Sequence, residues 1–254
     1  LIRNPAVKVI DASSAHRTAD GWTYGFPELS GQREKVAASR RVSNPGCWPT
    51  GFIALVRPLV EGGLVPAGWP LGLHGVTGYS GGGKSLIAEY ESGEARDVTR
   101  LYGLNLAHKH VPEMTVMSRL DHAPLFSPAV GRFPQGMCVE VPLHLSALPK
   151  RPNLASLRDS IAAAYAGEPF IDVASADECA QLQQAKTGAA GYAPALDPES
   201  LKDTNRLRLF VFGDDETGQA RLVSIYDNLG KGASGAAVQN LNLMLGLAET
   251  AGLT

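Results

Sequence analysis

The spacing of hydrophobic and polar positions predicts alternating strands and helices in the first half of the chain. The run Val7–Asp11 is rich in β-branched apolar residues and ends in an acid, which is typical of a buried strand. The turn Asn44–Thr50 leads into apolar positions with helical spacing, and Gly62–Gly63 ends that helix. A short strand at Leu71–Val76 and a short helix to about Glu91 follow. Such alternation favours an α/β lobe with a parallel sheet.

The second half of the chain is dominated by period-two spacing, which predicts antiparallel strands. Both Met114–Leu120 and Met137–Leu145 alternate, and in the second run the odd-numbered apolar side chains share one face. The remaining predicted elements are a helix capped by Asn153 that runs to about Ala166, a hairpin of Leu207–Phe212 with Arg221–Tyr226, and a last helix over about Gly235–Ala248. The predicted fold class is therefore α/β followed by α+β, in two lobes.

The composition excludes several classes of protein. With 23 basic and 25 acidic residues, the net charge of −2 leaves no basic face for a general nucleic-acid binder. No apolar run approaches the ~20 residues of a membrane span, and Arg3, Pro5 and Lys8 interrupt the stretch where a signal peptide would be apolar. The three cysteines have no metal-type spacing, and their odd number argues against a disulfide framework. We expect a cytoplasmic protein that binds neither nucleic acid nor membrane.

Cys47 is the first candidate for chemistry. The pair Pro45-Gly46 indicates a tight turn, and Pro49 suits the first position of a helix. Cys47 is therefore expected at a helix N-terminus, where free N–H groups lower the thiol pKa and can hold an oxyanion. This context favours a nucleophile over the alternative, a small buried hydrophobic residue.

The motif His-Lys-His-Val-Pro-Glu places His108 and His110 on one side of an extended chain. Beside a nucleophilic cysteine, one of them fits a general base that later acts as an acid. A metal site is an alternative, in which Glu113, Cys47 or Cys138 would supply a third ligand. A solvated loop with incidental histidines is the remaining interpretation.

Two glycine-rich stretches are candidate ligand-binding loops. Gly78–Ser85 fits the G-x-x-x-x-G-K-[ST] pattern of a P-loop, in which Lys84 would serve a nucleotide hydrolase. The predicted helix after it is too short for a P-loop protein, which favours a loop whose backbone lies near a ligand, or a simple turn. Gly230–Gly235 could bind an anion or act as a flexible connection. Arg17 and Arg132 could clamp a carboxylate or phosphate, with a surface role as the alternative.

Six segments share their order and motifs with one known family. They are Val9–Arg17, Asn44–Thr50, Gly78–Lys84, His108–Met114, Phe126–Gly136 and Asp227–Asn240. Together they resemble the N-acetyl-γ-glutamyl-phosphate reductases of arginine biosynthesis, in their shorter form, over nearly the whole chain. The combination of the Pro-Gly-Cys turn with His-x-His-x-Pro-Glu is specific. The family commonly has Tyr after the cysteine, where this chain has Trp48.

The resemblance implies an incomplete Rossmann-type lobe and a semialdehyde-dehydrogenase-like catalytic lobe with a mixed or antiparallel sheet. It implies a remnant of the NADP-binding lobe (1–46), a catalytic and dimerisation domain (47–230) and a C-terminal helix that returns to the first lobe (231–254). The implied catalytic residues are the nucleophile Cys47, the acid/base His108 and its helper His110. The implied cofactor-binding residues are Ser13, Gly78, Ser80, Gly81, Asn228 and Gly232. The implied substrate-binding residues are Arg17, Arg132 and Glu113.

The resemblance also implies a reaction: NADPH-dependent reduction of N-acetyl-γ-glutamyl phosphate through a cysteine thioester, without a metal, in a dimer or tetramer. In that scheme His108 protonates the thiohemiacetal oxygen. The family opens with a strand and a G-x-G-x-x-G turn that holds pyrophosphate, and no such motif precedes Val7. We therefore expect this chain alone to bind NADPH weakly. A P-loop-type nucleotide hydrolase using Lys84 and a non-catalytic interaction domain are the alternatives.

Overall fold

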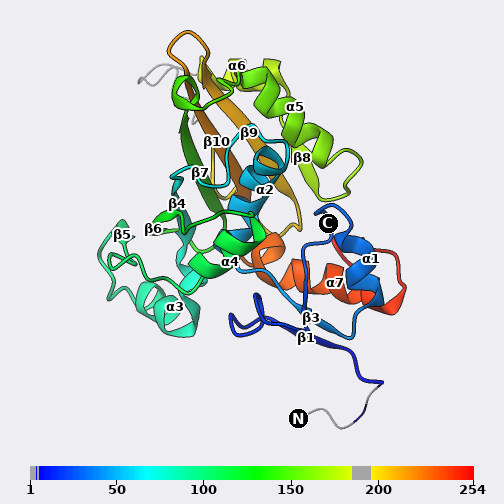
Figure 1. Ribbon diagram of the computed structural model, residues 1–254. Coiled ribbons are helices and arrows are strands. Elements are labelled where there is room, and N and C mark those ends of the chain that lie inside the picture. The colour runs from blue at the N-terminus through cyan, green and yellow to red at the C-terminus, as the bar shows by residue number, and fades with distance from the viewer. Residues whose placement is uncertain (1–3, 5, 185–195) are drawn as a thin grey trace.

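The strands form two sheets in a computed structural model that describes residues 4, 6–184 and 196–254 (Figure 1). The three-stranded sheet has the order β1-β3-β2, and the seven-stranded sheet has the order β5-β6-β4-β7-β10-β9-β8. The strands of the small sheet are β1 (Val9–Asp11), β2 (Thr23–Tyr24) and β3 (Arg41–Ser43). Those of the large sheet are β4 (Gly72–Gly78), β5 (Thr99–Leu101), β6 (Leu125–Gly131), β7 (Met137–His144), β8 (Ile171–Val173), β9 (Leu207–Asp214) and β10 (Gln219–Tyr226).

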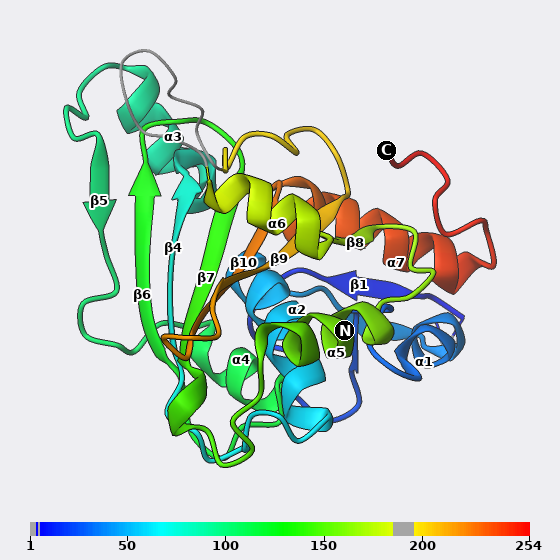
Figure 2. The same ribbon diagram turned by 90° about the horizontal axis from the view of Figure 1, so that it is seen from above.

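The small sheet is parallel, and helices from both ends of the chain cover it. Helices α1 (Gln32–Ala38) and α7 (Gly235–Leu245) lie against each other, and α7 also contacts β1 (Figure 2). The core of this region contains Val36, Val42 and Met244, and each of them is completely or almost completely buried. The C-terminal helix therefore packs on the N-terminal segment. The predicted first strand is present as β1, but it is half-buried and not buried as predicted.

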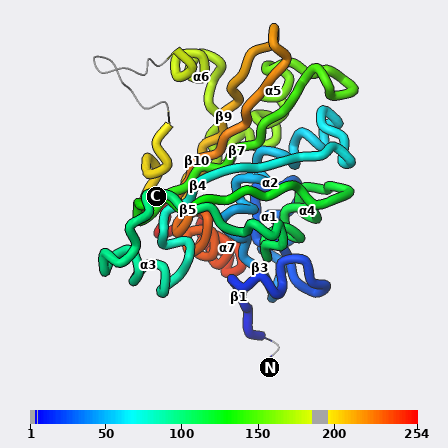
Figure 3. The backbone as a smooth tube through the Cα atoms, turned by 90° about the vertical axis from the view of Figure 1, so that its left-hand side faces the viewer, coloured from blue at the N-terminus to red at the C-terminus, as the bar shows by residue number. Residues whose placement is uncertain are grey.

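The large sheet is mixed, with antiparallel pairing of β7, β10 and β9 and parallel pairing of β4 with β6. Its main core lies on the face covered by α2 (Cys47–Glu61), α4 (Val111–Met117) and α5 (Leu154–Ala164), as Figure 3 shows for α2 and α4. The opposite face packs against α6 (Ala176–Gln183) through a second cluster that includes Cys138 and Cys179. The alternation predicted for Met137–Leu145 is confirmed, because Met137, Val139 and Val141 all face the main core.

One predicted strand, Met114–Leu120, is wrong: most of it belongs to helix α4. Pro112 fits the first turn of that helix, and Val111 and Met114 are buried three residues apart while Val116 is exposed. The buried residues therefore follow helical spacing, and the alternating Val116 lies on the exposed side of the helix. Pro49 is the third residue of α2 and not the first.

Other predicted elements are confirmed. Helix α2 ends at Gly62, Asn153 caps α5 with a capping box, and the hairpin of β9 and β10 is antiparallel. A short 3-10 turn (Tyr79–Gly82) separates β4 from α3 (Gly83–Glu91), and a π-helical turn (Gly230–Ser234) precedes α7. Both turns border the candidate active site.

Candidate active site

Cys47 is the first residue of α2, and its backbone is held from several sides. Gly46 is the N-cap, and its carbonyl accepts hydrogen bonds from the amide and the hydroxyl of Thr50 (3.1 and 3.0 Å). The fully buried Tyr226 donates its hydroxyl to the carbonyl of Cys47 (2.6 Å) and accepts the amide of Gly51 (3.1 Å). The Cys47 side chain is half-buried, whereas the other two cysteines are buried. The helix start therefore fixes the backbone of Cys47, the one cysteine of the three that is not buried.

Glu113 anchors the turn before Cys47 from inside the protein. Its carboxylate accepts hydrogen bonds from the amide of Gly46 (2.9 Å) and the hydroxyl of Tyr24 (2.7 Å), and forms an ion pair with Arg17 (3.0 Å). Arg17 also donates to the carbonyls of Asn44 (3.0 Å) and Ala12 (2.9 Å). Burial raises the pKa of Glu113, while Arg17 and the hydrogen bonds lower it in part. Glu113 is therefore placed to position the turn.

The two histidines have different environments. His108 is half-buried, and its Nδ1 accepts the backbone amide of His110 (3.2 Å), so the neutral ring carries its proton on Nε2. His110 is buried, and its Nδ1 has no hydrogen-bond partner. Burial lowers the pKa of His110 to about 2, and burial with the nearby Lys109 lowers that of His108. Of the two, His108 is the one suited to proton chemistry near neutral pH.

Aromatic rings link the start of α2 to His108. The indole nitrogen of Trp48 donates to the hydroxyl of Tyr102 (2.8 Å), whose ring lies edge-on to His108 at 5.8 Å. Phe126 contacts both Trp48 and His108, with ring centroids 5.2 and 5.1 Å apart. These contacts orient the His108 imidazole relative to the residue after Cys47. Tyr102 was missed by the sequence analysis, because a single tyrosine in a loop gives no local signal.

A cavity of about 550 Å³ brings most of the predicted site residues together. Three cationic side chains, Arg17, Arg100 and Lys109, line it, and its described lining contains no acidic residue. Carboxylates behind the lining pair with Arg17 and Arg100, so the cavity offers an anionic ligand positive groups whose charge is partly offset. Arg100 was also missed by the sequence analysis. The predicted residues in the lining are Arg17, Cys47, Ser80, Gly81, His108, His110, Asn228 and Gly232.

Four of the predicted cofactor residues meet on one wall of this cavity. Asn228 is buried, donates to the hydroxyl of Ser80 (2.9 Å) and accepts the amide of Gly136 (2.7 Å). Gly81 lies next to Ser80 on the same wall. Gly232 packs so tightly that a Cβ there would lie 3.0 Å from the Cβ of Cys47. A side chain at this position would press on Cys47, so the backbone of Gly232 lies close against the nucleophile.

The other predicted site residues lie outside the lining. Ser13 binds the side chain of Asp11, and Glu113 lies behind the turn. Arg132 is exposed and donates to the backbone carbonyls at positions 95 and 97. Gly78 is buried, and a Cβ there would clash with the backbone of residues 134 and 135. The glycine at position 78 therefore serves packing.

The loop after β4 does not have the geometry of a P-loop. The amides of Gly78, Tyr79 and Ser80 donate to carbonyls of residues 136, 133 and 134, so they are not free to cradle a phosphate. Lys84 is exposed and does not line the cavity. The match to the nucleotide-binding pattern in Gly78–Ser85 is therefore a coincidence of composition.

The Cys47 thiol differs from the sequence-based expectation. Burial raises its pKa to about 11, and the amides of Trp48 and of Cys47 itself, together with Arg17, lower it only in part. The prediction of a lowered thiol pKa is thus wrong, because desolvation outweighs the helix N-terminus. The resting group is a thiol at neutral pH.

The alkylation rate of Cys47 by iodoacetamide is therefore expected to rise about tenfold per pH unit between about pH 7 and pH 10, since only the thiolate reacts. Peptide mass spectrometry of the native protein measures this rate, with the buried Cys138 and Cys179 as internal controls that stay unlabelled. A rate that reaches its plateau below about pH 8 would mean that a thiolate already exists in the resting site.

Among residues 4, 6–184 and 196–254, no three or more His, Cys, Asp or Glu side chains are grouped so that they could hold a metal ion. Within the same ranges, no helix is long and apolar enough to cross a membrane. His108 and His110 are therefore interpreted without a third metal ligand.

The fold and the cysteine site define a protein of the semialdehyde dehydrogenase class. The family model described as "Semialdehyde dehydrogenase, dimerisation domain" matches residues 47–228. Solved structures show the same fold: aspartate semialdehyde dehydrogenase II of Vibrio cholerae has a TM-score of 0.62 at 16% identity, covering 93% of this chain and 72% of that chain. A probable aspartate-semialdehyde dehydrogenase of Pseudomonas aeruginosa also gives 0.62, at 15% identity, covering 94% and 72%.

Sequence comparison narrows the class to one family. The proteins named N-acetyl-gamma-glutamyl-phosphate reductase from Brucella suis and Brucella ovis are each 51% identical to this chain over 246 residues. The matched region covers 95% of this chain and 76% of each relative. The chain belongs to the N-acetyl-gamma-glutamyl-phosphate reductase family, as the sequence motifs predicted.

Proposed function

We propose that this protein reduces N-acetyl-γ-glutamyl phosphate to N-acetylglutamate semialdehyde with NADPH, in the cytoplasm and as part of arginine biosynthesis. The observation that carries the proposal is the half-buried Cys47 at the start of α2, in a cationic cavity shared with His108. Membership of the reductase family gives the proposal its substrate and its nicotinamide cofactor.

The charge of the cavity supports this substrate class. An N-acylated γ-glutamyl phosphate carries an α-carboxylate and a phosphate, and Arg17, Arg100 and Lys109 face the same space. Arg17 and Arg100 are held in place by protein carboxylates, so their guanidinium groups are oriented before a ligand arrives. We assign them to anion binding, with Arg17 closer to the turn that carries Cys47.

The first chemical step forms a thioester. The Cys47 sulfur bonds to the acyl carbon, the bond from that carbon to the phosphate oxygen breaks, and the thiol proton ends on the departing phosphate. The amides at the start of α2 stabilise negative charge on the carbonyl oxygen during the attack. Because the thiol is protonated at rest, the anionic leaving group is a suitable final acceptor of its proton.

His108 acts on the carbonyl oxygen. Its Nε2 proton is the hydrogen-bond donor that remains after Nδ1 accepts the His110 amide. This donor stabilises the oxygen when the thioester carbonyl becomes tetrahedral, and the tetrahedral centre then collapses to the aldehyde and the Cys47 thiolate. The thiolate takes up a proton from solvent and so returns to the resting thiol. His110 keeps the ring of His108 in place through its amide and through ring contact at 4.7 Å.

The cavity wall fits a nicotinamide cofactor. Ser80, Gly81, Asn228 and Gly232 present a hydroxyl, an amide and backbone without side chains on the same cavity as Cys47. The volume of about 550 Å³ lies within the ~300–1,000 Å³ of small-molecule sites. When bound, the cofactor supplies the hydride that reduces the thioester. We further propose that the functional protein is a homo-oligomer and needs no metal.

The reverse reaction tests the proposal, because the semialdehyde is more stable than the acyl phosphate. The protein is mixed with N-acetylglutamate semialdehyde, phosphate and NADP, and the formation of NADPH is followed by its absorbance. Aspartate semialdehyde and NAD serve as the competing substrate and cofactor. We expect turnover only with the N-acetylated substrate, and faster turnover with NADP than with NAD. Equal rates with aspartate semialdehyde would contradict the assigned substrate, and turnover without phosphate would contradict the phosphorylating reaction.

A further inference from the structure

We infer that the buried ion pair between Lys231 and Glu28 positions Cys47 through the π-helical turn Gly230–Ser234. This inference rests on the proposed role of Cys47 as the nucleophile. Lys231 and Glu28 are among the most buried charged residues described, at 2% exposure each. Neither lines the cavity, so neither can contact a substrate there.

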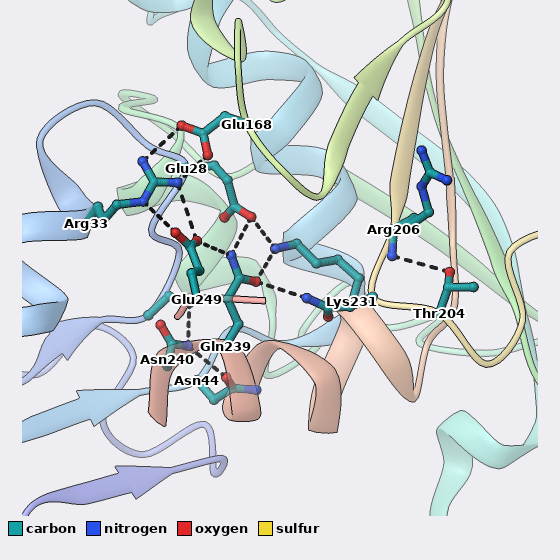
Figure 4. Close-up of polar contacts among 12 residues, drawn as sticks. Glu28, Arg33, Asn44, Glu168, Thr204, Arg206, Lys231, Gln239, Asn240 and Glu249 are labelled. Carbon is teal, nitrogen blue, oxygen red and sulfur yellow. Dashed lines mark hydrogen bonds and ion pairs between the residues drawn. The ribbon is translucent and has the colours of Figure 1, made fainter. Parts of the chain in front are cut away.

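Side chains of the protein hold the Lys231 ammonium (Figure 4). Its ammonium donates to Glu28 Oε1 (2.5 Å) and to the side-chain oxygen of Gln239 on α7 (2.7 Å). The same ammonium lies 5.6 Å from the ring centroids of both Phe26 and Phe170. Because Glu28, Phe26 and Phe170 lie far from Lys231 in the sequence, these contacts fix the Lys231 side chain and the turn that carries it.

Gly232, the residue after Lys231 in the turn, packs against the nucleophile, and Ala233 holds the segment just before it. A Cβ at Gly232 would lie 3.0 Å from the Cβ and 3.4 Å from the Cα of Cys47. The carbonyl of Ala233 accepts a hydrogen bond from Asn44, which lies just before the Pro-Gly-Cys turn (2.8 Å). Gly232 and Ala233 line the cavity. Lys231 therefore points into the buried cluster while its neighbours form the wall against Cys47.

A buried ion pair stabilises a turn only when both charged partners are present. Removing one partner leaves an uncompensated charge in an apolar site, so the turn can hold its place only while both partners are present. Glu28 Oε1 also accepts from Gln239, so the pair joins α7 to the N-terminal segment at the same point. A small displacement of Gly232 would change the space at Cys47, and such displacements reduce rates strongly.

The experiment compares Lys231→Met and Glu28→Gln with the control Arg33→Met. Arg33 belongs to the same cluster, pairing with Glu168 and Glu249, but it has no contact with the turn (Figure 4). Each variant of the full chain is assayed for its unfolding temperature, the alkylation rate of Cys47 and the rate of thioester formation with N-acetyl-γ-glutamyl phosphate. Alkylation reports the surroundings of the sulfur, which a purely structural role would leave unchanged in folded protein.

We expect Lys231→Met to slow thioester formation by about 10²-fold and to change the alkylation rate, with a smaller effect of Glu28→Gln, which keeps the hydrogen bonds. Arg33→Met should lower the unfolding temperature and leave both rates unchanged. Wild-type rates in folded Lys231→Met would overturn the inference, as would equal changes in Arg33→Met. If Lys231→Met does not fold, Glu28→Gln is the test variant, and wild-type rates in folded Glu28→Gln would overturn the inference. If the substitutions change the alkylation rate of Cys47 but the wild-type protein forms no thioester, only the proposed function is rejected.

Discussion

Replacing Cys47 with serine is expected to lower NADPH-dependent reduction by about 10³-fold or more, with the fold intact. Sulfur donates little electron density into the carbonyl, so a thioester accepts hydride much more readily than a serine ester. The hydroxyl of serine is also harder to ionise than the thiol, even though burial raises the pKa of Cys47 to about 11. The rate of NADPH oxidation with the acyl phosphate measures the loss.

The fold should tolerate this one-atom exchange. The contacts of Tyr226 and Glu113 reach the backbone of the turn and leave the sulfur untouched. The matched control is Cys138→Ser, because Cys138 lies on the other face of β7, outside the cavity, with Glu140 within reach of a hydroxyl (3.8 Å from the sulfur). Cys138→Ser should keep wild-type activity. Substantial reduction by Cys47→Ser would refute the covalent route.

The secondary structure was predictable wherever local chemistry decided it. Gly62 ends α2, Asn153 caps α5, and the alternation in β7 identifies its core face. The strand prediction for Met114–Leu120 was wrong because a short apolar segment fits both the strand period and the helix period. The packing of Val111 and Met114 against the core selects the helix. The order of strands in the large sheet was beyond reach, because it depends on pairing between distant segments.

The residues of the candidate site also differ in whether local sequence or long-range contacts reveal them. The Pro-Gly-Cys turn and the histidine motif are local, so Cys47 and His108 could be found in the sequence. Tyr102, Arg100 and Lys231 carry no local signal, because their roles arise from contacts with residues far along the chain. They become visible only in the folded protein.

The direction of the Cys47 pKa shift shows most clearly what the sequence alone cannot predict. A helix N-terminus is a local feature and lowers the pKa of a cysteine. The burial that raises the pKa of Cys47 is a tertiary property, created by segments such as the turn at Gly232 that pack on it. Sequence reasoning included the first effect and had no access to the second.

Replacing His108 with asparagine is expected to reduce the rate of the intact reaction by ~10²–10⁴-fold. Asparagine removes the Nε2 donor, whereas the His108→Gln variant can bring an amide N–H close to the same place. Because the structure assigns the proton of the neutral ring to Nε2, His108→Gln should retain more activity than His108→Asn. Steady-state kinetics should show the loss in kcat, since the donor acts on the carbonyl oxygen as charge develops.

The matched control is His110→Asn. His110 is buried, its pKa falls to about 2, and its main contact with His108 is made by its backbone amide, which the substitution keeps. We therefore expect a smaller loss of kcat and a lower unfolding temperature from the change in packing. If His110→Asn proved the more damaging variant in kcat, the donor to the carbonyl oxygen would be His110 and not His108. If His108→Gln and His108→Asn were equally impaired, proton transfer by the imidazole itself would replace hydrogen-bond donation as the role of His108.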